Sequence, residues 1–211
     1  MSASEDVLGP WRSPIPMTGM LATDVRAYLA SFGCALTAHH SGAVAKEARL
    51  LALRFGVDAD RAEAAGWLHD VSAVIPRSQR VAVALALGVP VLPEEHRAPV
   101  IVHQKLSAVL AQELFHVDDR GILDAIRYHT TLHPDADLLA RVVFLADKIR
   151  WDQVGEPPYL ARLQQVLETG SLDAACCVYL DFLWERRETL PVVHPWMVAA
   201  RHRLCVSGGC L

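Results

Sequence analysis

The chain has 211 residues, of which 52% are hydrophobic and 21% charged, so it can bury the core of one globular domain and is not disordered. Its net charge is −4 and no run of Lys or Arg occurs, which argues against nucleic acid or an anionic membrane surface as a partner. The chain start lacks a signal-peptide pattern and no apolar stretch approaches the ~20 residues of a membrane span, so we expect a soluble cytoplasmic protein.

Apolar residues recur with a period near 3.6 from residue 23 onward, which predicts an all-α protein. Residues 1–20 are rich in proline and glycine and are expected to form an extended arm. Helix start and stop signals then predict one helical domain over 21–204 and a flexible tail over 205–211. In chain order, the predicted helices cover about 23–32, 36–55, 58–73, 77–87, 99–114, 118–130 and 135–149, followed by two that begin near 157 and 171 and a terminal stretch to about 204. Asp58, Asp118 and Asp135 are the expected start residues of three of them.

Six polar residues fall on the apolar faces of five predicted helices, where core residues belong. They are His40, His69, Asp70, His103, His129 and Asp147. One buried histidine is usually a hydrogen-bonded core residue, but burying all six unpaired would be very costly, and too few basic residues face inward to neutralise both aspartates. A metal centre inside the helical bundle removes this cost.

Four imidazoles and two carboxylates exceed what one four-coordinate ion needs, and an adjacent His-Asp pair lets the carboxylate reach a second ion. We therefore expect two metal ions, which ~3.5 to 4 Å apart can hold a bridging hydroxide and neutralise charge at phosphorus. Nitrogen and oxygen ligands without thiolate suit iron or manganese. The sequence thus predicts a hydrolase of phosphoesters or phosphoanhydrides, with His69 and Asp70 as its catalytic pair.

The order of these six residues resembles that of the HD-domain metal-dependent phosphohydrolases. Four segments are most similar to the YqeK family: AAGWLHD (64–70), VHQKLSAVLA (102–111), AIRYHTT (125–131) and VVFLADKI (142–149). The resemblance covers about 36–200 and implies hydrolysis of diadenosine tetraphosphate to two ADP at a two-iron centre. It also implies that one metal is held by His40, His69, Asp70 and Asp147, and the other by Asp70, His103 and His129.

The same resemblance implies a set of substrate contacts near the mouth of the site. Arg127, Thr130 and Lys148 match positions that could grip phosphate oxygens. Thr37 and Ala73 stand where the family usually has basic residues, and His133 and Arg150 could restore that charge, while Trp151 could stack on a base. The substrate is accordingly expected to be a small nucleotide or phosphate ester.

Three other interpretations stay open at this point. The same six ligands would serve a di-iron oxygenase, and a one-metal nucleoside monophosphatase would need only His40, His69, Asp70 and Asp147. A binding or regulatory protein would hold an inert metal. The oligomeric state is also open, a homodimer included.

The five cysteines are an odd number and contain no CxxC pair. This pattern favours reduced thiols over a disulfide framework or a cysteine zinc site. The adjacent Cys176 and Cys177 are expected to be small buried apolar residues.

Overall fold

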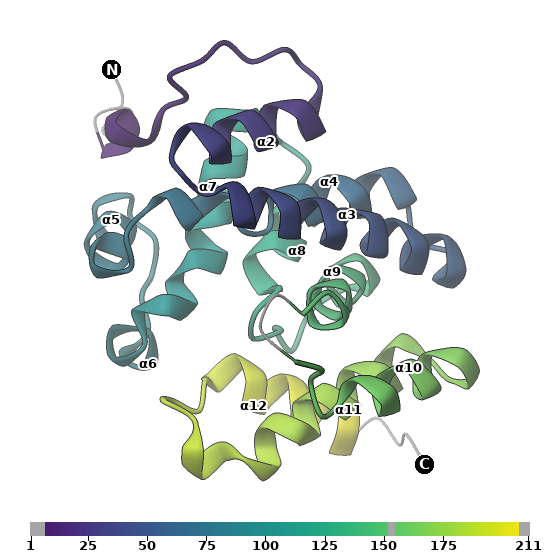
Figure 1. Ribbon diagram of the computed structural model, residues 1–211. Helices are drawn as coiled ribbons and strands as arrows, with labels where there is room; N and C mark the ends of the chain where they lie inside the picture. Colours follow the sequence, from purple (N-terminus) through teal and green to yellow (C-terminus); the bar gives the residue numbers. More distant parts are fainter. Residues whose placement is uncertain (1–6, 152–154, 207–211) are drawn as a thin grey trace.

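The computed structural model describes residues 7–151 and 155–206, and every regular element within these ranges is helical (Figure 1). The predicted all-α fold is confirmed. No helix in the described ranges is both long and apolar enough to cross a membrane. Residues 1–6 of the predicted arm and 207–211 of the predicted tail lie outside the description.

Five helices form the central bundle: α3 (Ala35–Phe55), α4 (Ala59–Leu68), α7 (His103–Phe115), α8 (Arg120–Tyr128) and α9 (Leu138–Ile149). α3 packs along α4 and α9, while α8 packs against α7 and α9. Gly66 of α4 lies so close to α3 that a Cβ atom there would come within 2.6 Å of the Ala45 Cα, so only glycine fits this crossing. The close crossing brings the end of α4 against the middle of α3.

Aspartate side chains cap the start of three bundle helices. Asp58 caps α4 as predicted, whereas α8 and α9 are capped by Asp119 and Asp137 and begin a few residues later than the predicted start residues Asp118 and Asp135. In each case a carboxylate oxygen accepts a hydrogen bond from a backbone amide of the first turn. Neighbouring aspartates have the same side chain, so the sequence alone does not show which of them caps the helix.

The remaining helices surround this bundle (Figure 1). α2 (Leu21–Ser31) packs on α3 and α4, and α5 (Arg80–Ala86) packs on α7, with α6 (Pro93–Arg97) near the start of that helix. α10 (Leu160–Thr169), α11 (Leu172–Glu185) and α12 (Pro195–Arg201) form a further layer, in which α11 packs against α9. Short 3₁₀ turns cover Gly9–Trp11, Val71–Val74, Arg77–Gln79, Pro99–Val102 and Arg187–Thr189, and a π turn covers His202–Val206.

The segment before α2 is held against the domain. Leu8 is buried, and the Tyr28 hydroxyl donates a hydrogen bond to the Trp11 carbonyl at 2.7 Å. The Asp24 carboxylate accepts hydrogen bonds from the amide and the hydroxyl of Thr18. These contacts fix the path of the described part of residues 1–20 on the bundle.

Two cysteines are paired, so the prediction of reduced thiols is wrong for them. Cys177 of α11 and Cys205 form a disulfide, with their Cα atoms 5.5 Å apart. Cys176 is free and buried, as predicted, and Cys34 is free and half-buried. The two partners lie 28 residues apart and meet only because the π turn after α12 packs back on α11. Their spacing along the chain therefore carries no pairing signal.

A buried charge cluster ties α6 and α7 to the residue before α12. The Glu95 carboxylate is fully buried and accepts hydrogen bonds from the Lys105 ammonium and the Leu92 amide, both at 2.7 Å. The His194 Nε2 atom lies 3.5 Å from its other oxygen. Helix α6 was not predicted, although Pro93 in the first turn and Glu95 two residues later are typical of a helix start.

We expect Glu95→Gln to lower the free energy of unfolding by about 3–5 kcal/mol, because it leaves the buried Lys105 ammonium without its counter-ion. Burial alone would raise the pKa of Glu95, but His194, the Leu92 amide and Lys105 more than offset this and lower it. A lowered pKa means that the carboxylate stabilises the fold above its ordinary value of 4.5, and that this stabilisation is lost as the pH falls through the folded-state pKa. Urea unfolding at neutral and acidic pH measures both effects.

Glu94→Gln on the same helix is the matched control. Glu94 pairs with Arg97 at 3.3 Å on the protein surface, so its loss should cost less than about 1 kcal/mol. Equal unfolding free energies for the Glu94→Gln and Glu95→Gln variants would show that the buried cluster does not stabilise the fold.

Candidate metal centre

The six predicted ligands converge at one place inside the bundle. They come from the interior of α3 (His40), the two residues after α4 (His69 and Asp70), the first residue of α7 (His103), the residue after α8 (His129) and the last turns of α9 (Asp147). Three of the six therefore follow directly on a helix end. The 3₁₀ turn over Val71–Val74 interrupts the helix predicted over 58–73, and Asp70 lies at this change of direction.

One side of the cluster contains His40, His69 and Asp147. The His40 Nε2 atom lies 3.2 Å from Asp147 Oδ1, and the His69 Nε2 atom lies 3.7 Å from the same oxygen. One ligand atom from each of these three residues lies within 4.8 Å of the others. This grouping can hold a metal ion with two nitrogen ligands and one oxygen ligand.

The Asp70 carboxylate joins this side to the other. Its Oδ2 atom lies 3.6 Å from His69 Nε2, while its Oδ1 atom lies 3.2 Å from His103 Nε2 and 3.6 Å from His129 Nε2. The two oxygens of one carboxylate thus face different imidazoles. A carboxylate in this position can bridge two cations.

Backbone carbonyls set the orientation of three of the rings. The Nδ1 atoms of His69, His103 and His129 hydrogen-bond the carbonyl oxygens of Gly66, Val100 and Ile126, at 2.8, 2.5 and 2.8 Å. Because a carbonyl only accepts, each Nδ1 must carry the proton, and in the neutral ring the Nε2 lone pair faces the cluster. This is the tautomer that metal-ligating histidines adopt.

Burial and charge act on the ionisable groups in opposite directions. Burial alone would raise the pKa values of Asp70 and Asp147, but His69 and His103 beside the first, and Lys148 and His40 beside the second, lower both. The pKa of His129 lies well below its ordinary value, chiefly because the ring is buried. The site therefore presents ionised carboxylates and a neutral imidazole at neutral pH, the protonation states in which these groups bind metals.

The surroundings of three histidine Nε2 atoms also fit a metal ion at this place. His69 is fully buried, and its Nε2 atom has no hydrogen-bond partner among the described residues. The Nε2 atoms of His103 and His129 lie 3.0 Å apart, so two lone pairs face each other in the neutral tautomers. A cation that accepts these lone pairs removes both costs, which a purely structural hydrogen-bond network would not do.

A cavity of about 350 Å³ opens beside the cluster, with His40 and Asp70 in its wall. Thr37, Arg150 and Trp151 also line it, and the Arg150 guanidinium pairs with Glu47 at 2.5 Å. The predicted contact Thr130 lies at the cluster itself. Its Oγ1 atom is 3.0 Å from His129 Nε2 and 3.2 Å from His103 Nε2.

Three predicted substrate contacts lie elsewhere. Arg127 pairs with Asp124 at 3.0 Å and lines a different cavity, and His133 stacks on Tyr128 with ring centroids 4.7 Å apart. Lys148 is buried, not placed at the mouth, and its ammonium donates hydrogen bonds to Asp147 Oδ2 at 2.6 Å and to the His129 carbonyl at 3.2 Å.

Lys148 is an inward basic partner for one of the two aspartates, Asp147. The family resemblance places Lys148 near the mouth of the site, and neighbouring residues on a helix point about 100° apart. The long lysine side chain instead folds back and buries its charge against the Asp147 carboxylate.

The model of the HD domain family matches residues 37–152, which is more than half of the chain and contains all six clustered residues. The chain belongs to the HD domain family. An HD superfamily hydrolase from Clostridium acetobutylicum, described as involved in NAD metabolism, has the same fold, with a TM-score of 0.78 over 86% of this chain and 95% of that one at 24% identity.

Two curated relatives of this HD domain protein are similar over shorter regions. A Lactococcus lactis protein described only by its place in the pepC 5' region is 40% identical over 148 residues, 70% of this chain and 74% of the relative. A symmetrical bis(5'-nucleosyl)-tetraphosphatase from Bacillus subtilis is 37% identical over 117 residues, 54% of this chain and 62% of the relative. The chain is thus a hydrolase at the level of its family, and its cluster is one that can hold metal.

Proposed function

We propose that this protein is a dinuclear metal-dependent phosphohydrolase that cleaves diadenosine tetraphosphate, or a closely related dinucleoside polyphosphate, symmetrically to nucleoside diphosphates. The observation that carries the proposal is the shared Asp70 carboxylate, whose two oxygens face His69 on one side and His103 and His129 on the other. The names of relatives in Bacillus subtilis and Halalkalibacterium halodurans, both symmetrical tetraphosphatases, support the choice of substrate.

The residues divide into two ligand sets around Asp70. His40, His69, Asp70 and Asp147 would hold one ion, and Asp70, His103 and His129 would hold the other, with iron or manganese best suited to these donors. When bound, two such ions activate water and neutralise the charge that develops on a phosphoryl group.

The chain's own groups bind and orient the substrate at this point. Arg150 lines the cavity beside His40 and Asp70, where its guanidinium can bind phosphate oxygens. Thr130 lies against His103 and His129 and can donate a hydrogen bond to an oxygen of the reacting phosphate. Trp151, which is 37% exposed, offers a ring face on which a nucleobase can stack.

The test is product analysis with diadenosine tetraphosphate. We expect ADP as the sole nucleotide product, because symmetrical cleavage divides the four phosphates equally. Removal of metal with a chelator should abolish turnover, and addition of Fe²⁺ or Mn²⁺ should restore it. Formation of ATP and AMP, or hydrolysis that is indifferent to metal removal, would contradict the proposal.

Metal content and oxygen dependence separate the alternatives. Close to two metal atoms per chain are expected in protein purified without oxygen. One firmly bound atom together with hydrolysis of nucleoside monophosphates would favour a one-metal monophosphatase. Consumption of dioxygen with no nucleotide hydrolysed would favour a di-iron oxygenase.

A further inference from the structure

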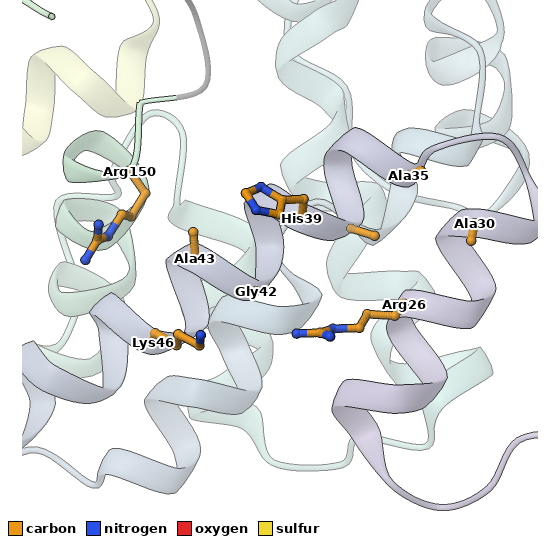
Figure 2. A pocket seen from close by; sticks show the side chains of 9 residues that line it. Arg26, Ala30, Ala35, His39, Gly42, Ala43, Lys46 and Arg150 are labelled. Carbon is orange, nitrogen blue, oxygen red and sulfur yellow. The ribbon is translucent and has the colours of Figure 1, made fainter.

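A basic groove lies along the outer face of α3, between α2 and the end of α9. It encloses about 610 Å³, and its lining includes Arg26 from α2, His39 and Lys46 from α3, and Arg150 from the end of α9, with no acidic side chain among the lining residues. Figure 2 shows these four basic side chains gathered around the small residues of α3. The groove is a local concentration of positive charge on a chain whose net charge is −4.

The local sequence explains how the groove forms. Gly42 and Ala43 lie between His39 and Lys46, so small residues make the floor. A Cβ atom on Gly42 would come within 2.7 Å of the buried Trp67 ring, so glycine allows this ring to pack against α3. The Arg26 guanidinium lies over the same ring, 4.8 Å from its centroid. A cation–π contact thereby holds Arg26 at the groove while its charge stays exposed to solvent.

Arg26 and Lys46 form no ion pair with a carboxylate in the part of the chain that the structure describes. By contrast, Arg49, less than one turn further along α3, binds both Asp60 at 2.5 Å and Glu63 at 2.9 Å. Two exposed cations that lack counter-ions in one concave surface favour a polyanion as the ligand.

The groove adjoins the cavity at the metal centre. His39, Ala43 and Arg150 line both, and the wall of the second contains His40 and Asp70. From His39 to Lys46 the path along α3 measures about 10 Å at the helical rise of 1.5 Å per residue. This length is comparable to that of an extended oligophosphate, so a chain of phosphates in the groove can span from His39, which also lines the second cavity, to Lys46.

We propose that this groove binds the part of an oligophosphate substrate that is not attacked, and that Arg26 and Lys46 thereby select long, highly charged substrates over mononucleotides. The proposal rests on the proposed function for the reaction at Asp70, but it assigns a site that lies outside the six-residue cluster. Arg150, common to both cavities, connects the two.

The test compares two double variants with the same change in charge. Arg26→Gln with Lys46→Gln removes both groove cations, whereas Arg54→Gln with Arg77→Gln removes two exposed cations that line neither cavity. Calorimetric titration of the full-length protein with inorganic tripolyphosphate should give a dissociation constant about tenfold weaker for the groove variant. Exposed ion contacts are worth up to about 1 kcal/mol each, and a combined loss of about 1.4 kcal/mol is tenfold. The control should match the unmodified protein. Metal content is measured for each variant before and after titration.

Kinetics with diadenosine tetraphosphate supply the second readout. The groove variant should raise KM about tenfold with a smaller change in kcat, because the contact is made before and during the reaction. Equal tripolyphosphate affinity in the groove variant and the unmodified protein, or equal weakening in both double variants, would overturn the proposal. If the protein hydrolyses no dinucleoside polyphosphate but the groove variant alone loses tripolyphosphate binding, the oligophosphate site stands and the proposed function fails.

Discussion

Asp70→Asn should abolish hydrolysis and lower the metal content at the same time. The substitution keeps the size of the side chain but removes the charge whose two oxygens face His69 and His103. Two unit charges about 4 Å apart interact by about 4 kcal/mol at an effective dielectric constant of 20, which corresponds to about a thousandfold in affinity. Metal analysis of the purified variant and the turnover of diadenosine tetraphosphate measure the two effects.

Asp124→Asn is the matched control for this change. Asp124 lies on α8 and pairs with Arg127 and Arg120 on the surface, so its replacement removes one carboxylate without touching the cluster. It should leave metal content and activity unchanged. Normal metal loading and substantial activity in the Asp70→Asn variant would mean that Asp70 is not the bridging ligand.

The sequence was sufficient to find the cluster because its members lie on regular apolar stripes. A polar residue at a core position of a helix points inward whatever the tertiary arrangement, and the all-α fold follows from the same periodicity. His40 and Asp147 illustrate this, since they come from α3 and α9 and meet at 3.2 Å. The structure thus brings together the residues that helical periodicity selected.

The basic groove could not be found in the same way. His39 and Lys46 read as ordinary surface residues of one helix, and Arg26 belongs to another. Their proximity depends on how α2 packs on α3 and α4, where the Trp67 ring contacts both Gly42 and Arg26. The Cys177–Cys205 disulfide was missed for the same reason, because its partners meet only through the docking of α12 and its π turn on α11.

The side chain of Lys148 could not be placed from the sequence. The family resemblance implies a position at the mouth of the site, but a long flexible side chain can turn toward the interior from there. Burial alone would lower the pKa of the Lys148 ammonium, yet Asp147 more than offsets this and raises it. The ammonium therefore stays charged inside the protein and fixes one oxygen of a predicted metal ligand.

Lys148→Met should lower kcat about 10- to 100-fold with little change in KM, as expected for a group that orients a metal ligand. The variant keeps the length of the side chain but leaves the Asp147 carboxylate and the His129 carbonyl without their donor. The free energy of unfolding should fall by about 3–5 kcal/mol because a buried carboxylate loses its partner. Steady-state kinetics and urea unfolding measure these effects, and metal analysis measures the ion content. Circular dichroism confirms that the variant is folded.

Lys46→Met provides the comparison, because Lys46 is an exposed lysine of the groove and has no ion pair with a described carboxylate. It should raise KM while metal content and unfolding free energy stay the same. If Lys148 instead gripped a substrate phosphate at the mouth, the Lys148→Met variant would behave like Lys46→Met, with a raised KM and an unaltered metal content. A positioning residue changes kcat, stability and metal binding together, since all three depend on where it holds the Asp147 carboxylate.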